Sequence, residues 1–325
     1  MASYRKTKSG WRVEICIQRQ RDSGTFDTKA EAKAWADQRE VEICSGAARL
    51  STTKTLADAY DHYAKEVSVH KRGRRWEEIR LKKLARHAIA AKCLASLTKY
   101  DLIEWRDEQL RVLGAGSVIR EMTLINHALH LACEEWGWIK TNPMKGVSRP
   151  RAPRARTRRP TQDEIDRIVL ALGFVDGEPV MTSSQRTAVA YLFGIETAMR
   201  AGEICDLLPK HVDIEARTAH LPMTKNGLAR DVPLSARAVE LLQSVEPWGE
   251  TVFQVSAGVR DTLFRRARNA CEIEDLTFHD GRREATSRLA KKLHPLELAR
   301  MTGHTNLKEL LTYYNESASE IAKKL

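Results

Sequence analysis

Residues 278–314 read FHDGRREATSRLAKKLHPLELARMTGHTNLKELLTYY and carry four side chains suited to phosphate chemistry: His279, Arg282, His304 and Tyr313. The segment has no glycine-rich phosphate loop, no acidic cluster for Mg²⁺ and no spaced Cys/His set for zinc. The guanidinium, imidazole and phenol groups that remain suit attack of a tyrosine on a phosphodiester, with side chains alone stabilising the developing charge. We therefore expect no metal and no other cofactor.

The composition predicts a cytoplasmic protein with a polyanionic partner. The chain has 325 residues, enough for two or three domains, and 42% of them are hydrophobic. No apolar run approaches the ~18 residues of a membrane span, and the basic start MASYRKTKSGW leads into no apolar signal core. The six cysteines are scattered, which favours reduced thiols over disulfides or metal ligands. A net charge of +11 favours a polyanion, although charge is informative only where it is concentrated.

Residues 1–48 are predicted to form a small separate module of three short strands and a helix. Strands are expected near residues 4–8, 11–17 and 19–26, with turns at 9–10 and 23–24. Thr28 and Glu31 have capping-box spacing at the start of the helix. Basic residues lie on or beside the strands, namely Arg5, Lys6, Lys8, Arg12 and Arg19. They could form a solvated face, but with the rest of the chain in view we favour a sheet that lies on DNA.

Residues 53–150 are predicted to form a bundle of four or five short helices. An apolar stripe at helical spacing is made by Leu56, Ala59, Tyr60, Tyr63 and Val67. A basic run at residues 70–75 precedes the second helix, and its candidate DNA contacts are Arg72, Arg74 and Arg75. Without the rest of the chain, this pattern fits almost any helical domain.

Residues 151–160 are predicted to form an extended basic linker. Prolines exclude a helix there, and the candidate DNA contacts are Arg151, Arg154, Arg156 and Arg158. The segment could be a plain flexible linker. A plain linker needs no such charge, so we favour a strap along a phosphate backbone.

Residues 161–325 are predicted to form a mixed, mostly helical domain. Thr161 and Glu164 have capping-box spacing before an apolar helical stripe. Short β-prone pieces at 211–214, 218–221 and 229–233 surround Asn226-Gly227, a strong hairpin signal, with Lys225 beside it. The predicted fold class is therefore mainly α with small β elements (α+β): a three-stranded sheet with a helix, a helical bundle and a helical domain with a hairpin.

A second group of charged residues completes the pattern. Arg200 and Glu203, in TAMRAGEIC, are three apart at a helix start and lie on neighbouring surface. Alone such a pair means little. Together with Lys225, His279-x-x-Arg282, Gly303-His304 and Tyr313, the chain resembles the tyrosine recombinase family, the phage-type integrases. Those enzymes have a T-G-x-R-x-x-E-L box, a hairpin lysine, an H-x-x-R box, an L-G-H box and a tyrosine nine residues beyond its histidine, which here is Tyr313.

Four positions depart from the usual family pattern, but none removes a charged or nucleophilic group. Ala198 replaces a usual glycine, Thr302 a usual leucine, and Arg283 and Asn315 stand where histidine is frequent.

The resemblance implies a site-specific recombinase that integrates or excises a phage or other mobile element without metal or ATP. It implies that Tyr313 attacks the scissile phosphate to form a 3′-phosphotyrosyl link, while Arg200 and Arg282 hold the non-bridging oxygens. Lys225 would be the general acid, and His279 the proton acceptor or a phosphate contact. His304 would bond a phosphate oxygen, and Glu203 would support the site.

The same resemblance implies the domains and partners. Residues 1–48 would be an arm-type DNA-binding module, 53–150 a helical core-binding (SAM-like) domain and 161–325 the catalytic domain. The partners would be double-stranded DNA with core and arm attachment sites, a homo-tetramer on paired sites and DNA-bending accessory proteins, with no membrane.

The choice between two adjacent tyrosines can also be made from periodicity. Leu307, Leu310, Leu311 and Tyr314 have the spacing of a buried helical stripe, which predicts Tyr314 in the core. Tyr313 would then be turned about 100° away from that face.

Two other functions remain open at this stage. A type IB topoisomerase uses similar chemistry, but the N-terminal module and the additional helical domain disfavour it. A DNA-binding regulator derived from a recombinase is disfavoured by the complete set of catalytic residue types.

Overall fold

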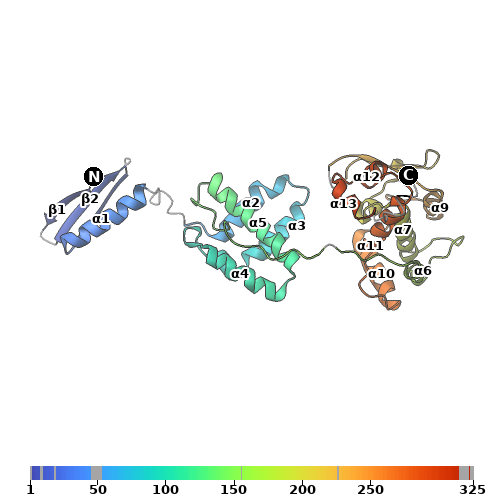
Figure 1. The fold of residues 1–325 in the computed structure, drawn as a ribbon, viewed down its shortest axis with the longest axis horizontal. Coiled ribbons are helices and arrows are strands. Elements are labelled where there is room, and N and C mark those ends of the chain that lie inside the picture. The colour runs from blue at the N-terminus through green and yellow to red at the C-terminus, as the bar shows by residue number, and fades with distance from the viewer. Residues whose placement is uncertain are drawn as a thin grey trace. The chain divides into compact units, whose positions relative to one another are not determined.

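The computed structural model describes residues 2–7, 10–17, 20–44, 53–154, 156–224, 227–314 and 322. The chain divides into two units, Met1–Ala155 and Arg156–Leu325. Helices predominate and the strands form two small antiparallel sheets, so the predicted fold class is confirmed (Figure 1). None of the helices in the described ranges is long and apolar enough to cross a bilayer.

The N-terminal sheet forms because apolar and polar residues alternate along its middle strand. Strands β1 (Ala2–Thr7), β2 (Gly10–Ile17) and β3 (Gln20–Phe26) pair in that order, and α1 (Lys29–Cys44) packs on one face. Val13 and Ile15 are fully buried in one cluster with Ala32 and Ala36 of α1. The predicted capping box is present: the N–H of Glu31 donates to the Thr28 hydroxyl at 3.2 Å, and the N–H of Thr28 to the Glu31 carboxylate at 3.2 Å.

The turn predicted at residues 23–24 is wrong. Gly24 lies inside β3 and pairs with Val13. A Cβ at Gly24 would come within 2.7 Å of the Phe26 ring, which lies two residues on along the same face. The glycine therefore makes room for an aromatic side chain, and the strand continues past it.

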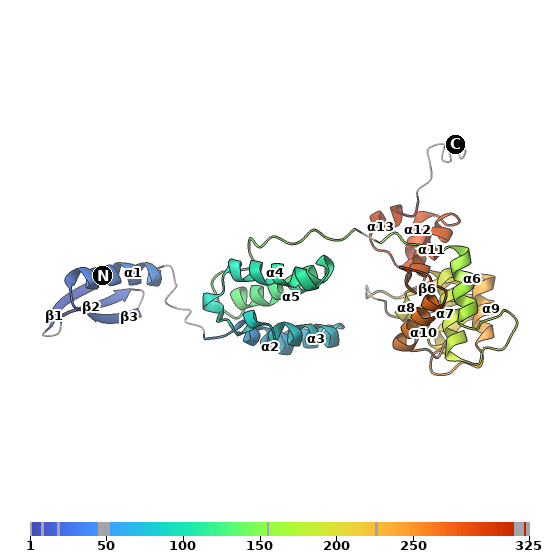
Figure 2. The same cartoon turned by 90° about the horizontal axis from the view of Figure 1, so that it is seen from below.

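The helical bundle contains four α-helices and three 3₁₀ helices in its described part. The α-helices are α2 (Leu56–Glu66), α3 (Arg74–Ala85), α4 (Lys99–Val112) and α5 (Ala115–Glu134). The 3₁₀ helices are Ser68–His70, Ala88–Ala91 and Leu94–Ser96. Figure 2 shows α4 and α5 in one layer and α2 and α3 in the other. Predicted stripe residues such as Leu56, Tyr60 and Tyr63 are at most 1% exposed.

The second unit is a mostly helical domain with one three-stranded sheet. Its helices are α6 (Gln162–Ala171), α7 (Ser183–Thr197), α8 (Ala201–Cys205), α9 (Ala236–Ser244), α10 (Ala257–Ala270), α11 (Asp280–Ala290), α12 (Pro295–Thr302) and α13 (Leu307–Leu311), with a 3₁₀ helix at Pro209–His211. The sheet has the order β4 (Val212–Asp213), β5 (Thr218–Leu221), β6 (Arg230–Pro233), and β5 and β6 are the predicted hairpin strands.

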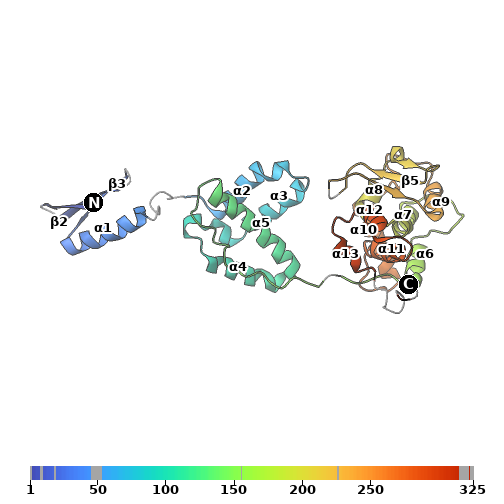
Figure 3. The same cartoon turned by 45° about the horizontal axis from the view of Figure 1, so that its top comes forward.

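Central helix α7 positions the elements that carry the predicted catalytic residues. Its buried residues Ala188, Tyr191 and Ile195 belong to the main core of this unit. Helix α11 packs on α7 and on α12 (Figure 3). Helix α12 in turn packs on β6. Segments that lie about 100 residues apart in the sequence therefore meet around one end of α7.

Candidate active site

The first part of the site is the junction between α7 and α8. Helix α7 is capped at its C-terminus by Ala198, whose φ of 51° lies in the left-handed region. A side chain there costs about 1 kcal/mol or more, which gives a physical reason for the glycine usual at this position. Arg200 is the N-cap residue of α8: its N–H donates to Glu203 Oε2 at 2.9 Å, and its Nη1 donates to Oε1 at 2.9 Å. The predicted pair is therefore both a helix cap and an ion pair.

Glu203 has a second guanidinium partner that the sequence analysis did not identify. Arg230 of β6 donates to both carboxylate oxygens, at 3.0 and 2.6 Å. Burial alone raises the pKa of Glu203, but the bonds from Arg230 and Arg200 outweigh it, so the pKa is lowered and the carboxylate stays charged. A signal was available: Arg230 shares a face of β6 with fully buried Val232, and a buried arginine requires an acidic partner.

Arg282 is held by backbone carbonyls of two other segments. Its side chain is buried, Nη1 donates to the carbonyl of Ala198, and Nη2 donates to the carbonyl of Thr302 at 2.9 Å. Burial and the nearby cation of Arg200 lower its pKa to about 10, so it remains charged at neutral pH. Among the described residues no carboxylate forms an ion pair with Arg282, so this guanidinium, fixed by neutral oxygens, keeps its positive charge available for an anion.

His304 follows directly on the C-terminus of α12. This helix ends in Gly303, whose φ of 71° is the left-handed conformation of a C-cap glycine. Arg230 Nε also donates to the carbonyl of Met301 at 2.9 Å, so the same arginine binds Glu203 and the end of α12. Burial and three arginines lower the pKa of His304 to about 4, which leaves it neutral at pH 7.

His279 lies at the N-terminus of α11, one turn from Arg282. Its side chain is exposed on one side. Partial burial on the other side and the cation of Arg282 lower its pKa, so the neutral imidazole predominates at pH 7. A neutral imidazole is the form that can accept a proton.

Tyr313 and Tyr314 have different environments in the structure, but the predicted helical stripe from Leu307 to Tyr314 is not the reason. Helix α13 ends at Leu311, and of the four stripe residues only Leu310 is buried, while Leu307 and Leu311 are 45% and 60% exposed. The stripe prediction was wrong because a five-residue helix cannot continue the 3.6-residue period to Tyr314.

Both tyrosines are partly buried against the cluster of Ala290, Leu298 and Leu310. The Tyr314 hydroxyl donates to the carbonyl of Leu293 at 2.9 Å, and burial raises its pKa. Tyr313 lies under the guanidinium of Arg283, 5.6 Å from the ring centroid, and its phenolate form would raise the pKa of Arg282. Tyr314 is thus tied to the backbone through its hydroxyl, whereas the ring of Tyr313 lies beneath the guanidinium of Arg283.

The hairpin lysine lies outside the described residues. Lys225 and Asn226 are not among them, but the residues that flank them close the turn: Gly227 N–H donates to the Thr224 carbonyl at 2.9 Å, and Thr224 N–H to that of Leu228 at 3.2 Å. The role of Lys225 stays a prediction.

The site as a whole is an anion-binding surface. Arg200 and Arg230 share one carboxylate, Glu203, and Arg282 is bound by backbone carbonyls, so positive charge is in excess beside two neutral histidines. No group of three His, Cys, Asp or Glu able to hold a metal ion lies together in the part of the chain that the structure describes. The arrangement can hold a phosphate and stabilise negative charge that develops on it.

Candidate DNA contacts of the N-terminal sheet lie on different faces. Arg5 and Arg12 are paired directly across β1 and β2, on the face opposite α1. Arg12 also forms an ion pair with Glu14 on the same face at 3.1 Å, which offsets its repulsion with Arg5. Lys6 is opposite Trp11 and lies on the α1 side, whereas Lys8 and Arg19 fall outside the described residues.

In the bundle, the three candidate arginines lie at the start of α3 or just before it. Arg74 donates to Glu78 at 2.6 Å, and the Arg75 guanidinium lies 6.0 Å from the centroid of the exposed Trp76 ring. Arg72 is exposed.

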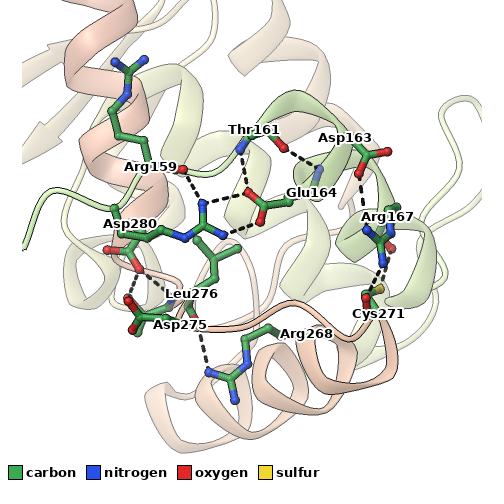
Figure 4. A network of polar contacts seen from close by, with 12 residues as sticks. Arg159, Thr161, Asp163, Glu164, Arg167, Arg268, Cys271, Asp275, Leu276 and Asp280 are labelled. Carbon is green, nitrogen blue, oxygen red and sulfur yellow. Dashed lines mark hydrogen bonds and ion pairs between the residues drawn. The ribbon is translucent and has the colours of Figure 1, made fainter.

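The arginines of the basic linker fall into two groups, exposed residues in its first half and ion-paired residues in its second half. Arg151 and Arg154 are exposed. Arg156 forms a bidentate pair with Asp280 at 2.7 and 2.8 Å and also reaches Asp275 at 2.6 Å. Arg158 binds Glu164 through both terminal nitrogens. Glu164 also accepts from the N–H of Thr161 in the capping box (Figure 4). The second half of the linker is therefore bound to carboxylates of its own unit.

Comparisons with known proteins agree with this geometry. Residues 158–320 match the phage integrase family. A putative integrase/recombinase of Haemophilus influenzae is 40% identical over 98% of this chain and 89% of its own length. The shufflon-specific DNA recombinase of Escherichia coli is 35% identical over 83% of this chain and 71% of its own. A lambda integrase tetramer bound to a Holliday junction has a similar fold, with a TM-score of 0.67 and 19% identity over 95% of this chain and 94% of its own.

Proposed function

The chain belongs to the phage integrase family, and we propose a role in strand exchange for each residue of its site. It is a site-specific tyrosine recombinase, and a phosphotyrosyl intermediate is typical of its family. The observation that carries the proposal is the position of Arg200 and Arg282, two charged guanidinium groups fixed by Glu203 and by backbone carbonyls.

The proposed reaction begins with in-line attack of the Tyr313 oxygen on the scissile phosphorus. The new O–P bond forms as the bond to the 5′-oxygen breaks, which gives a 3′-phosphotyrosyl link and a 5′-hydroxyl. Arg200 and Arg282 bind the non-bridging oxygens, for which the guanidinium fork is suited. The link retains the phosphodiester energy, so the 5′-hydroxyl of another strand can reverse the step without ATP.

Two proton transfers accompany this step. The lowered pKa of His279 supports its role as acceptor of the Tyr313 proton. Lys225 of the hairpin donates a proton to the leaving 5′-oxygen. His304 binds a non-bridging oxygen, and Glu203 keeps Arg200 and Arg230 in place.

DNA contacts are proposed for surfaces outside the catalytic unit. The Arg5–Arg12 face of the N-terminal sheet suits the arm-type module (1–48), and the basic residues near 72–75 suit the core-binding domain (53–150). Exposed Arg151 and Arg154 suit a strap on the backbone. For Arg156 and Arg158 the ion pairs with Asp280 and Glu164 favour a structural role.

The assembly is proposed by analogy with the relatives. The similar lambda integrase structure is a tetramer on a Holliday junction, and a homo-tetramer on paired sites with DNA-bending accessory proteins would fit this chain. We place its action in the cytoplasm of a bacterial host, where the DNA of a prophage or other mobile element is accessible.

A nicked substrate tests the proposal. The junctions of the DNA that flanks the gene are first mapped, and the core site is synthesised with a nick beside the scissile phosphate so that the cleaved strand is lost. We expect a covalent protein–DNA product with the intact chain and with Tyr314→Phe, and none with Tyr313→Phe. Trapping of DNA by Tyr313→Phe would overturn the assignment of the nucleophile. Recombinant junctions between two marked duplexes would then distinguish a recombinase from a topoisomerase.

A further inference from the structure

Thr302, at the end of α12, has a hydroxyl with two close polar neighbours. The side chain is fully buried. Its Oγ1 lies 2.6 Å from the carbonyl oxygen of Leu298 and 2.6 Å from Nδ1 of His304. A side chain without a hydroxyl could make neither contact.

The two distances determine where the hydroxyl proton lies. A carbonyl oxygen can only accept a hydrogen bond, and a threonine hydroxyl has one proton to give. If that proton went to His304, two acceptor oxygens would face each other at 2.6 Å with no proton between them. The hydroxyl therefore donates to Leu298, and its lone pair accepts from His304. Nδ1 must then carry a proton.

A proton on Nδ1 determines the character of the other ring nitrogen. In a neutral imidazole only one nitrogen carries a proton, so Nε2 has a free lone pair. The charged groups around the ring favour the neutral form, since they are the guanidinium groups of Arg282 from α11, Arg200 at the start of α8 and Arg230 from β6. Glu203 is the one carboxylate bound to these arginines among the described residues, and it is already paired twice.

We propose that Thr302 is a positioning residue that holds His304 in the Nδ1–H form, so that His304 can contact a phosphate oxygen only as an imidazolium. The inference deepens the proposed function and rests on it for the identity of the ligand. A phosphate oxygen only accepts hydrogen bonds, and Nε2 of the neutral ring has no proton to donate. Binding of the scissile phosphate therefore takes up one proton from solvent at Nε2. The negative charge of the phosphate supplies the driving force, because it favours the charged ring.

The tautomer can be measured directly by nitrogen NMR on the full-length protein. The chain has ten histidines, so protein labelled with ¹⁵N at histidine is compared with His304→Gln to assign the signals of His304. At pH 7.5 we expect the wild-type ring to be neutral with the proton on Nδ1. Thr302→Ser should keep this pattern, and isosteric Thr302→Val should change it to the Nε2–H form. A wild-type ring with the proton on Nε2, or a tautomer unchanged in Thr302→Val, would overturn the proposal.

Proton uptake is tested with sulfate, an oxyanion that does not titrate between pH 6 and 8. At pH 6.5 we expect saturating sulfate to convert His304 of the wild type and of Thr302→Ser to the imidazolium. In Thr302→Val the ring should stay neutral and donate from Nε2. A neutral wild-type ring in saturating sulfate would show that no proton is needed. Neither readout depends on DNA cleavage, so failure here is distinct from failure of the proposed recombinase mechanism.

Discussion

At the scale of single residues, one carboxylate organises the site. Glu203 joins Arg200 of the α7–α8 junction to Arg230 of the hairpin, and Arg230 in turn binds the end of α12. Three segments that are distant in sequence are thereby held together by charge-assisted hydrogen bonds, which are about twice as strong as neutral ones. Glu203, which has only a supporting role in the proposed reaction, thus holds Arg200 and Arg230 in place.

Replacement of Glu203 by Gln should therefore destabilise the protein in a pH-dependent way. The pKa of Glu203 is lowered by folding, so its contribution to stability is present above the unfolded pKa of about 4.3 and is lost as pH falls through the folded value. We expect the free energy of unfolding to be lower in Glu203→Gln by about 2–4 kcal/mol at pH 7, with the difference shrinking below about pH 4. Urea unfolding from pH 3 to 7.5 measures it, and a difference that is constant over this range would contradict the expectation.

Individual residues also show what motif spacing can and cannot predict. Arg200, Arg282 and His304 were recognised from motif spacing, and the structure brings them together. The spacing of motifs along the sequence does not show which side chains meet in the folded protein, so Arg230 was not predicted as a partner of Glu203. The stripe from Leu307 to Tyr314 was wrong for another reason, because periodicity assumes a continuing helix and α13 stops at Leu311.

At the scale of elements, the basic linker should be regarded as two segments. Its sequence showed uniform charge and proline content, which predicted one strap on DNA. The structure adds partners that composition cannot give: Arg156 binds Asp280, whose side chain is 3% exposed, and Arg159 binds Glu284 of the same helix α11 at 2.8 Å. The second segment therefore anchors the helix that carries Arg282, and His279 lies at its start.

Alanine substitutions on the two sides of residue 155 should consequently affect different properties: protein stability after residue 155 and DNA binding before it. Arg156→Ala should lower the free energy of unfolding of the second unit by about 1–2 kcal/mol, since buried Asp280 loses a partner that is itself part-exposed. Arg154→Ala, the matched control, should leave stability unchanged. It should instead reduce the slope of log K against log salt for duplex DNA by about 0.9, the value for one lost phosphate contact.

Denaturant unfolding and DNA titrations at several salt concentrations measure both variants. Equal stability of Arg156→Ala and the wild type would remove the anchoring role. A normal salt slope in Arg154→Ala would remove the phosphate contact.

At the scale of the whole molecule, the boundary between the two units falls inside the predicted linker, at Ala155 and Arg156. Each of the four hydrophobic clusters in the described residues lies within one unit. A unit with its own core can fold alone. The linker arginines Arg156, Arg158 and Arg159, however, form ion pairs within the second unit. A stable catalytic fragment must therefore include them.

A fragment of residues 150–325 should therefore unfold like the same unit in the intact chain, whereas a fragment of residues 160–325 should be less stable. The shorter fragment lacks Arg156, Arg158 and Arg159, and leaves Asp280, Glu164 and Glu284 without these cations. We expect a loss of about 2–4 kcal/mol, because removal of one partner leaves a poorly solvated charge.

The single tryptophan of both fragments, Trp248, reports their unfolding by fluorescence. Replacing Arg156, Arg158 and Arg159 together by alanine in the longer fragment should reproduce the stability of the shorter one, since both lack the same ion pairs. If the shorter fragment were as stable as the longer one, the linker arginines would contribute nothing to stability, and the folded unit would begin at α6.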